Sequence, residues 1–208
     1  HGVSNPERVY KDMVENPDAL REGLETITQT TIDFAKEVIA EGATGVFFGI
    51  GGGGKFWSRM TREQLEEYAL GYDKMVLEAI SDAPVKLLHI CSAGGEDPQR
   101  NGGYMEEGWF KNYPVDAINW DNALFTPVER AKEIYGGKFC IVGGIDRKKT
   151  LFEGTPHQVE VAVKDAIDRA GRGGGFIVGP GCTLNASTPV ENYNAVARAV
   201  EKYGKYKS

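Results

Sequence analysis

Five short apolar segments, each followed by a loop and then by a segment with helical periodicity, constrain the fold of this chain more than any other feature. The apolar segments cover residues 45–50, 85–91, 117–121, 138–146 and 176–179. Their continuous apolar character is typical of strands in a parallel sheet whose two faces are both covered. Strands that alternate with helices predict an α/β fold, either an open doubly wound sheet or part of a (β/α)₈ barrel. In both folds, ligands bind at the carboxyl ends of the strands.

The predicted helices carry their own start signals. The pattern Thr-Pro-x-Glu/Gln follows three of the predicted strands, and it predicts threonine as the N-cap and proline as the first helical residue. The three threonines are Thr126, Thr155 and Thr188. Two Asn-Pro pairs give a similar signal within residues 5–41, which form a predicted helical lead-in. The βα units are expected to cover residues 43–208. Together with the helical lead-in they are expected to form a single domain of 208 residues.

Two of the predicted strands end with residues that bind metals. Side chains alternate between the faces of a strand, so His89 and Cys91 point to the same side where their strand meets its loop. Cys182 follows the strand at 176–179 at the corresponding point. One imidazole and two thiols are ligands of Zn²⁺, and three protein ligands leave the fourth tetrahedral position open, as in catalytic sites. The spacing also allows a core histidine beside two buried thiols that act as small apolar side chains.

Other polar residues and a glycine-rich loop also fall at strand ends. Asn119 is one of them. Asp121 and Asp146 could each orient His89 through its second ring nitrogen or hold a substrate, and either could instead cap its own loop. No Gly-Lys-Ser/Thr follows the glycine run near residue 51, so it is not a phosphate-binding loop. We instead expect an active-site loop that contacts a cofactor through Gly51, Gly52 and Gly53.

Composition excludes several classes of function. The formal net charge of −6 argues against nucleic acid or an anionic membrane surface as the main partner. No long apolar run is present, so we expect no membrane-spanning segment. The 3 cysteines are an odd number, which favours a reducing cytoplasm over a disulfide framework. The third cysteine, Cys140, lies within an apolar run and is expected to fill the core.

Several motifs, spread over nearly the whole chain, resemble those of the uroporphyrinogen decarboxylase superfamily. They are Leu88-His89-Ile90-Cys91, Gly143-Gly144-Ile145-Asp146, Gly154-Thr155-Pro156, Gly171-Arg172-Gly173-Gly174-Gly175-Phe176-Ile177 with Gly181-Cys182, and Thr188-Pro189-Val190-Glu191-Asn192. The resemblance implies a (β/α)₈ TIM barrel of which this chain holds about the last five βα units. It also implies that about three N-terminal units are missing, so that these units or a partner chain would cover two open sheet edges.

The superfamily holds two chemistries. Uroporphyrinogen decarboxylases use no metal and carry a histidine where this chain has Cys182, which counts against that activity. The methylcobamide:coenzyme M methyltransferases use a His-x-Cys…Cys set as zinc ligands, and His89, Cys91 and Cys182 match it. The resemblance thus implies a zinc-dependent enzyme that moves a methyl group between a methyl-corrinoid, held by a separate carrier protein, and a small thiol such as coenzyme M. Two alternatives stay open, a metal-free carboxy-lyase and a non-catalytic family member.

Overall fold

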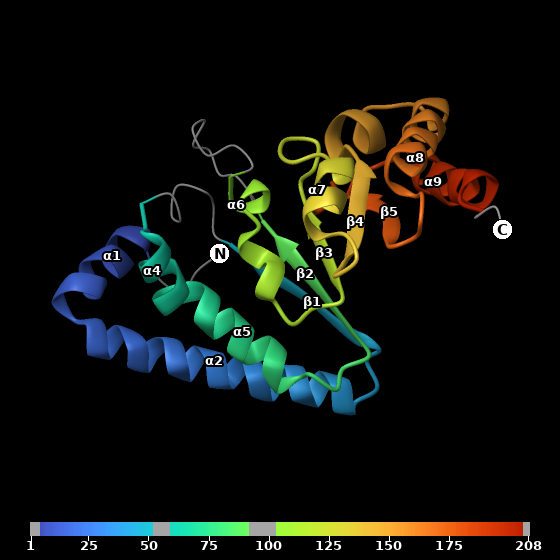
Figure 1. Cartoon of the computed structure of the whole chain (residues 1–208). Coiled ribbons are helices and arrows are strands. Elements are labelled where there is room, and N and C mark those ends of the chain that lie inside the picture. The colour runs from blue at the N-terminus through green and yellow to red at the C-terminus, as the bar shows by residue number, and fades with distance from the viewer. Residues whose placement is uncertain (1–4, 52–58, 92–102, 206–208) are drawn as a thin grey trace.

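The structure is a computed structural model that describes residues 5–51, 59–91 and 103–205 (Figure 1). Two helices come first, α1 (Pro6–Glu15) and α2 (Pro17–Ala40). The strands are β1 (Gly45–Ile50), β2 (Val85–Ile90), β3 (Ala117–Trp120), β4 (Cys140–Ile145) and β5 (Phe176–Pro180). The helices among them are α4 (Arg62–Leu65), the π-helix η1 (Glu66–Leu70), α5 (Gly71–Ala79), α6 (Gly103–Glu106), the 3₁₀-helix η3 (Trp109–Asn112), α7 (Val128–Tyr135), the π-helix η4 (Arg147–Phe152), α8 (Pro156–Ala170) and α9 (Val190–Tyr203). No helix in the described ranges combines the length and apolar character needed to cross a membrane.

The strands form one parallel sheet in which the spatial order follows the sequence, β1-β2-β3-β4-β5. A doubly wound sheet reverses its strand order at a switch point, and this sheet does not. When consecutive parallel strands are neighbours, right-handed connections place every helix on the same side of the sheet. This is the arrangement of a barrel. The described chain is therefore α/β and forms a five-stranded part of a barrel, which confirms the predicted fold class.

The main core lies between the helices and one face of the sheet. Leu88, Ile90, Ile118 and Trp120 point to this face and are 0% exposed. They belong to one cluster with buried residues of the surrounding helices, among them Leu65, Leu70, Leu77, Ala131 and Tyr135. The indole N–H of Trp120 donates to the carbonyl of Thr126 at 2.8 Å, so the largest buried side chain has its polar atom satisfied. Burial of this face holds the strands in register beneath the loops at their carboxyl ends.

The opposite face of the sheet is open at its two edge strands among the described residues. Phe47 on β1 stacks on the ring of His89, and Ile177 on β5 lies in the same register row as His89. Phe47 and Ile177 are 65% and 52% exposed. The expectation that both faces are covered is therefore wrong for the two edge strands in the described part of the chain. The physical reason is the sequential strand order, which puts all helices on one side and leaves the concave side of the sheet to form the barrel interior.

One of the three Thr-Pro segments forms the predicted cap. Thr155 accepts a hydrogen bond from the backbone N–H of Gln158, and the Gln158 side chain accepts one from the backbone N–H of Thr155, at 3.3 and 2.8 Å. The helices α7 and α9 instead begin one residue later than predicted. The hydroxyl oxygens of Thr126 and Thr188 are buried and lack a hydrogen-bond partner among the described residues. The predicted caps are wrong at these two positions, because burial of the side chains keeps the hydroxyls from the first turn of each helix.

The glycine-rich segment between α8 and β5 is shaped by left-handed backbone and by one lysine. Gly173, Gly174 and Gly175 have φ angles of +79°, +75° and +66°, which residues with a side chain rarely adopt. Three backbone carbonyls in and beside this segment accept hydrogen bonds from Nζ of Lys132 on α7, at 2.5, 2.6 and 2.7 Å. They belong to Ala170, Arg172 and Gly174. The lysine therefore ties α7 to the segment that leads into β5.

Candidate metal centre

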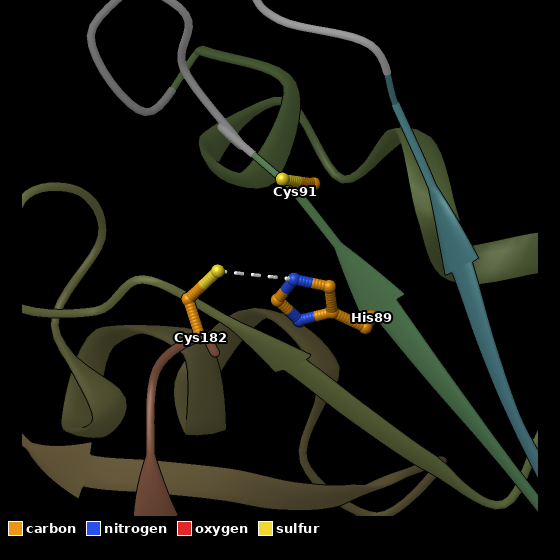
Figure 2. Close-up of side chains that lie close together, drawn as sticks. All are labelled: His89, Cys91 and Cys182. Atoms are coloured by element: carbon orange, nitrogen blue, oxygen red, sulfur yellow. Dashed lines mark hydrogen bonds between the residues drawn. The ribbon is translucent and has the colours of Figure 1, made fainter. Parts of the chain in front are cut away.

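His89, Cys91 and Cys182 meet at the carboxyl ends of the strands (Figure 2). His89 lies on β2, Cys91 follows that strand directly, and Cys182 follows β5. The strands β3 and β4 separate β2 from β5 in the sheet. In a flat sheet, strands three places apart would lie about 14 Å apart. The imidazole nitrogen and two sulfurs nevertheless lie within 4.8 Å of one another. The sheet therefore curves around its open face, and this curvature brings the remote cysteine to the other two residues.

The separation of Cys182 from His89 suits a tetrahedral metal ion. The sulfur of Cys182 lies 3.6 Å from Nε2 of His89. With metal–sulfur and metal–nitrogen distances of about 2.3 and 2.0 Å, ligand atoms around a tetrahedral ion lie about 3.5–3.8 Å apart. His89 is buried at 7% exposure, whereas both cysteines are half-buried. The donor set and the separation of Cys182 from His89 therefore fit Zn²⁺, and the partial exposure of the cysteines leaves a side from which a further ligand could approach.

Asn119 fixes the orientation and the tautomer of His89. Its amide nitrogen donates to the carbonyls of Val142 and Pro180, at 2.9 and 3.0 Å, so its amide oxygen must face the imidazole. That oxygen lies 2.7 Å from Nδ1 of His89 and can only accept, which places the ring proton on Nδ1. The other ring nitrogen, Nε2, is left as an acceptor toward Cys182. This is the state in which a histidine binds a metal.

The surroundings of His89 favour its neutral form. Burial lowers the pKa of His89, although the hydrogen bond to Asn119 and the negative charge of Asp121 act in the opposite direction. The positive charge of Arg147 lowers the pKa further. A metal competes with protons for the imidazole nitrogen, so a neutral ring is the form that coordinates.

The two aspartates do not orient His89, contrary to the prediction, because the ring nitrogen in question is bonded to Asn119. Asp146 instead accepts hydrogen bonds from the backbone N–H groups of Lys148 and Lys149, at 2.8 and 3.0 Å, and so caps η4. Asp121 is buried at 8% exposure and lies 3.4 Å from Nε of Arg147. Asn119 is among the residues predicted at strand ends, but its role as the partner of His89 is not predicted by the sequence. This role depends on the register, which pairs Asn119 directly with His89, whereas Asp121 lies beyond the paired residues. Holding substrate stays a proposal for both aspartates.

Gly51 lies against the metal-binding residues, at the end of β1. Its φ is +91°, and a Cβ on it would lie 2.7 Å from the carbonyl oxygen of Cys91. The backbone N–H of Cys91 donates to the carbonyl of Ile50 at 2.9 Å, which holds the two strand ends together. A residue other than glycine at 51 would thus displace the backbone beside Cys91. Gly52 and Gly53, which the sequence also assigns to this loop, lie outside the described residues.

Replacing Asn119 with leucine is expected to weaken zinc binding by about 10- to 100-fold, because His89 would lose the partner that sets its tautomer. Asn119→Asp keeps the acceptor for His89 but loses the donor to the two carbonyls, and should fall between leucine and wild type. Competition with a chromophoric chelator measures the affinity, with Asn194→Leu on the exposed face of α9 as a control. Unchanged affinity in Asn119→Leu would show that Asn119 does not control His89.

Comparison with known proteins identifies one family. The family model described as uroporphyrinogen decarboxylase (URO-D) matches residues 1–203. The chain is 22% identical over 191 residues to uroporphyrinogen decarboxylase of Coxiella burnetii, covering 92% of this chain and 49% of that protein. It is 31% identical over 143 residues to methylcobamide:CoM methyltransferase of Methanosarcina mazei, covering 68% of this chain and 37% of that protein. The chain thus spans about half or less of the length of these curated relatives.

A solved structure supports the same fold. A methyltransferase from Methanosarcina mazei superposes with a TM-score of 0.73 at 18% sequence identity. The match covers 96% of this chain and 54% of the solved one. At this identity the likeness establishes the fold and leaves the reaction to be argued from the site.

Proposed function

Because this chain belongs to the uroporphyrinogen decarboxylase family, we propose that it works as the zinc-dependent part of a corrinoid methyltransferase. The reaction would move a methyl group between a methyl-corrinoid and a small thiol such as coenzyme M. The observation that carries the proposal is the cluster of His89, Cys91 and Cys182, whose ligand atoms lie within 4.8 Å of one another at the carboxyl ends of the strands. The name of one relative, a methylcobamide:CoM methyltransferase, agrees with this reaction.

The residues of this cluster would hold the metal and leave room for the thiol. Bound zinc would lower the pKa of a coordinating thiol, so that the substrate sulfur is a thiolate at neutral pH. His89 contributes a neutral nitrogen that Asn119 keeps in place, and the two cysteines contribute thiolates that offset the charge of the ion. The partial exposure of both cysteines supports access from the open face of the sheet.

Atoms and electrons balance in this reaction without a further redox partner. The thiol would lose its proton to solvent, a carbon–sulfur bond would form, and the carbon–cobalt bond would break with its electron pair remaining on cobalt. The corrinoid would come from a separate carrier protein.

The open face and edges of the sheet support a second part of the proposal. Phe47 and Ile177 expose apolar surface toward the site, and β1 and β5 each lie at an edge of the sheet. We propose that further βα units or a partner chain cover this face in the working enzyme, since an exposed apolar sheet edge favours association.

The test measures metal and methyl transfer on the same preparation. Purified protein, reconstituted with zinc under reducing conditions, is analysed for metal content and then assayed for the loss of methylcobalamin in the presence of thiols. Near-stoichiometric zinc together with thiol-dependent demethylation would support the proposal. Zinc without transfer to any thiol would favour a non-catalytic family member. A folded protein that takes up no zinc would overturn the proposal and direct the assay to decarboxylation of uroporphyrinogen, the activity named for the Coxiella burnetii relative.

A further inference from the structure

Arg147 places a positive charge beside the candidate metal centre. It directly follows Asp146 and is the first residue of η4. Its Nη1 donates to the carbonyl of Thr183 at 3.1 Å, and its Nε lies 3.4 Å from a carboxylate oxygen of Asp121. Thr183 is the residue after Cys182. The guanidinium is therefore attached to the loop that carries one of the three candidate ligands.

Close packing holds this arrangement together. The side chains of Arg147 and Asp121 are 26% and 11% exposed. Gly181, just before Cys182, lies so close to Asp121 that a Cβ on it would be 2.7 Å from the Asp121 Cα. The end of β3 and the Cys182 loop thus pack backbone to backbone, with Arg147 bonded to both. This packing fixes where the guanidinium lies relative to the metal-binding residues.

Part of the guanidinium remains available. The contact with Asp121 is longer than the roughly 2.7–2.9 Å of a strong charge-assisted hydrogen bond. Nη2 of Arg147 makes no hydrogen bond to the described residues, and Nη1 uses one of its two protons. The planar guanidinium presents paired N–H groups that match the oxygens of a carboxylate or a sulfonate. A partly exposed arginine with such groups to spare is suited to receive an anion.

The negative charge around the metal favours binding of that anion at Arg147. Two protein thiolates offset the double charge of a zinc ion, so a bound substrate thiolate leaves the centre with an excess negative charge. The buried carboxylate of Asp121 adds to it. A second negative group on the same substrate would be repelled from the carboxyl ends of the strands unless a cation bound it. Arg147 is placed to do so.

We propose that Arg147 binds the negatively charged end of the thiol substrate and thereby selects short thiols with a carboxylate or sulfonate over neutral thiols. The inference rests on the proposed function, because it needs a thiol at the metal. Asp121 holds the guanidinium in place, and the substrate anion binds the N–H groups that remain. This assigns Arg147 a role in substrate specificity that no motif of the sequence indicates.

The experiment measures thiol binding, independently of turnover, on protein reconstituted with Co²⁺ in place of zinc. Each thiol is titrated against the thiolate-to-cobalt absorption band to give a dissociation constant. The probes are 3-mercaptopropionate, 2-mercaptoethanesulfonate and the neutral 2-mercaptoethanol. Wild type is compared with Arg147→Gln, Arg147→Lys and the control Lys148→Gln, which removes the neighbouring exposed charge.

Wild type is expected to bind both anionic thiols at least about 10-fold more tightly than 2-mercaptoethanol. Arg147→Gln should weaken binding of the anionic thiols by about 10- to 100-fold and change the neutral thiol less than about threefold. Arg147→Lys should keep part of the preference, and Lys148→Gln all of it. Equal weakening of all three thiols, or no change, in Arg147→Gln would overturn the inference and leave the proposed function standing. Failure of the wild type to bind cobalt or any thiol would overturn both.

Discussion

Replacing Cys182 with alanine is expected to weaken zinc binding by about 100- to 1,000-fold. A structural zinc ion contributes about 10–16 kcal/mol through four ligands, so each ligand accounts for a few kcal/mol. Cys182 is half-buried after β5, so its truncation should cost little stability apart from the metal. His89→Ala should weaken zinc binding at least as much, although loss of its buried ring will also destabilise the fold.

The chain offers a matched control in Cys140. This thiol begins β4, at the end of the sheet away from the cluster, and it is half-buried where the sequence predicts a core position. Burial raises the pKa of Cys140, so it is also the less reactive kind of thiol. Cys140→Ser should keep wild-type zinc content by elemental analysis and wild-type affinity by chelator competition. If Cys182→Ala and Cys140→Ser retain zinc equally, the ion binds elsewhere and the assignment of the ligands is wrong.

Replacing Asp73 with asparagine is expected to stabilise the fold by about 4 kcal/mol at pH 8 and by little at pH 4. Asp73 lies in the first turn of α5, where Tyr113 donates a hydrogen bond to it at 3.3 Å. Burial raises the pKa of Asp73 to about 7, against the opposing effects of Tyr113 and Lys74. Asparagine keeps an oxygen that can accept the bond from Tyr113 and never becomes charged.

The sign of the pH dependence follows from proton binding. An unfolded aspartate has a pKa of about 3.9, so between about pH 4 and pH 7 the folded protein binds more protons than the unfolded one. The free energy of unfolding therefore falls as the pH rises through this window and levels off above it. Urea unfolding of wild type and Asp73→Asn from pH 4 to pH 8 measures the difference. Asp82→Asn, at an exposed carboxylate, should change stability by less than about 0.5 kcal/mol throughout. A gain in Asp73→Asn that is the same at every pH would show that ionisation of Asp73 is not its cause.

Much of the fold follows from patterns that act locally. A continuous apolar run marks each strand in the sequence, and the alternation of strands with helices predicts a parallel sheet. The two-residue period of a strand places His89 and Cys91 on one side, as the structure has them. The position of Cys182 at the corresponding point of another strand suggests that it joins them, and the likeness to a known family strengthens that assignment.

The features that sequence reasoning missed depend on contacts between distant segments. The pairing of His89 with Asn119 needs the register of β2 on β3, and no motif encodes that register. The contacts of Arg147 with Asp121 and Thr183 arise only once the curved sheet brings three strand ends together. The exposed face of the sheet could not be predicted for a similar reason. An open doubly wound sheet and a barrel have the same alternation of strands and helices along the chain, and only the order of the strands in the sheet distinguishes them.

The curvature that gathers the three candidate ligands also gives a bound ion a second consequence. Cys182 and His89 are 93 positions apart in the chain, so an ion shared by them would close a large covalent loop in the way a disulfide does. Unlike a disulfide, this crosslink opens whenever the ion leaves. Zinc would then join β2 to the loop that follows β5, and removal of the ion by a chelator would open this loop. The supply of metal would thereby govern resistance to proteolysis as well as chemistry.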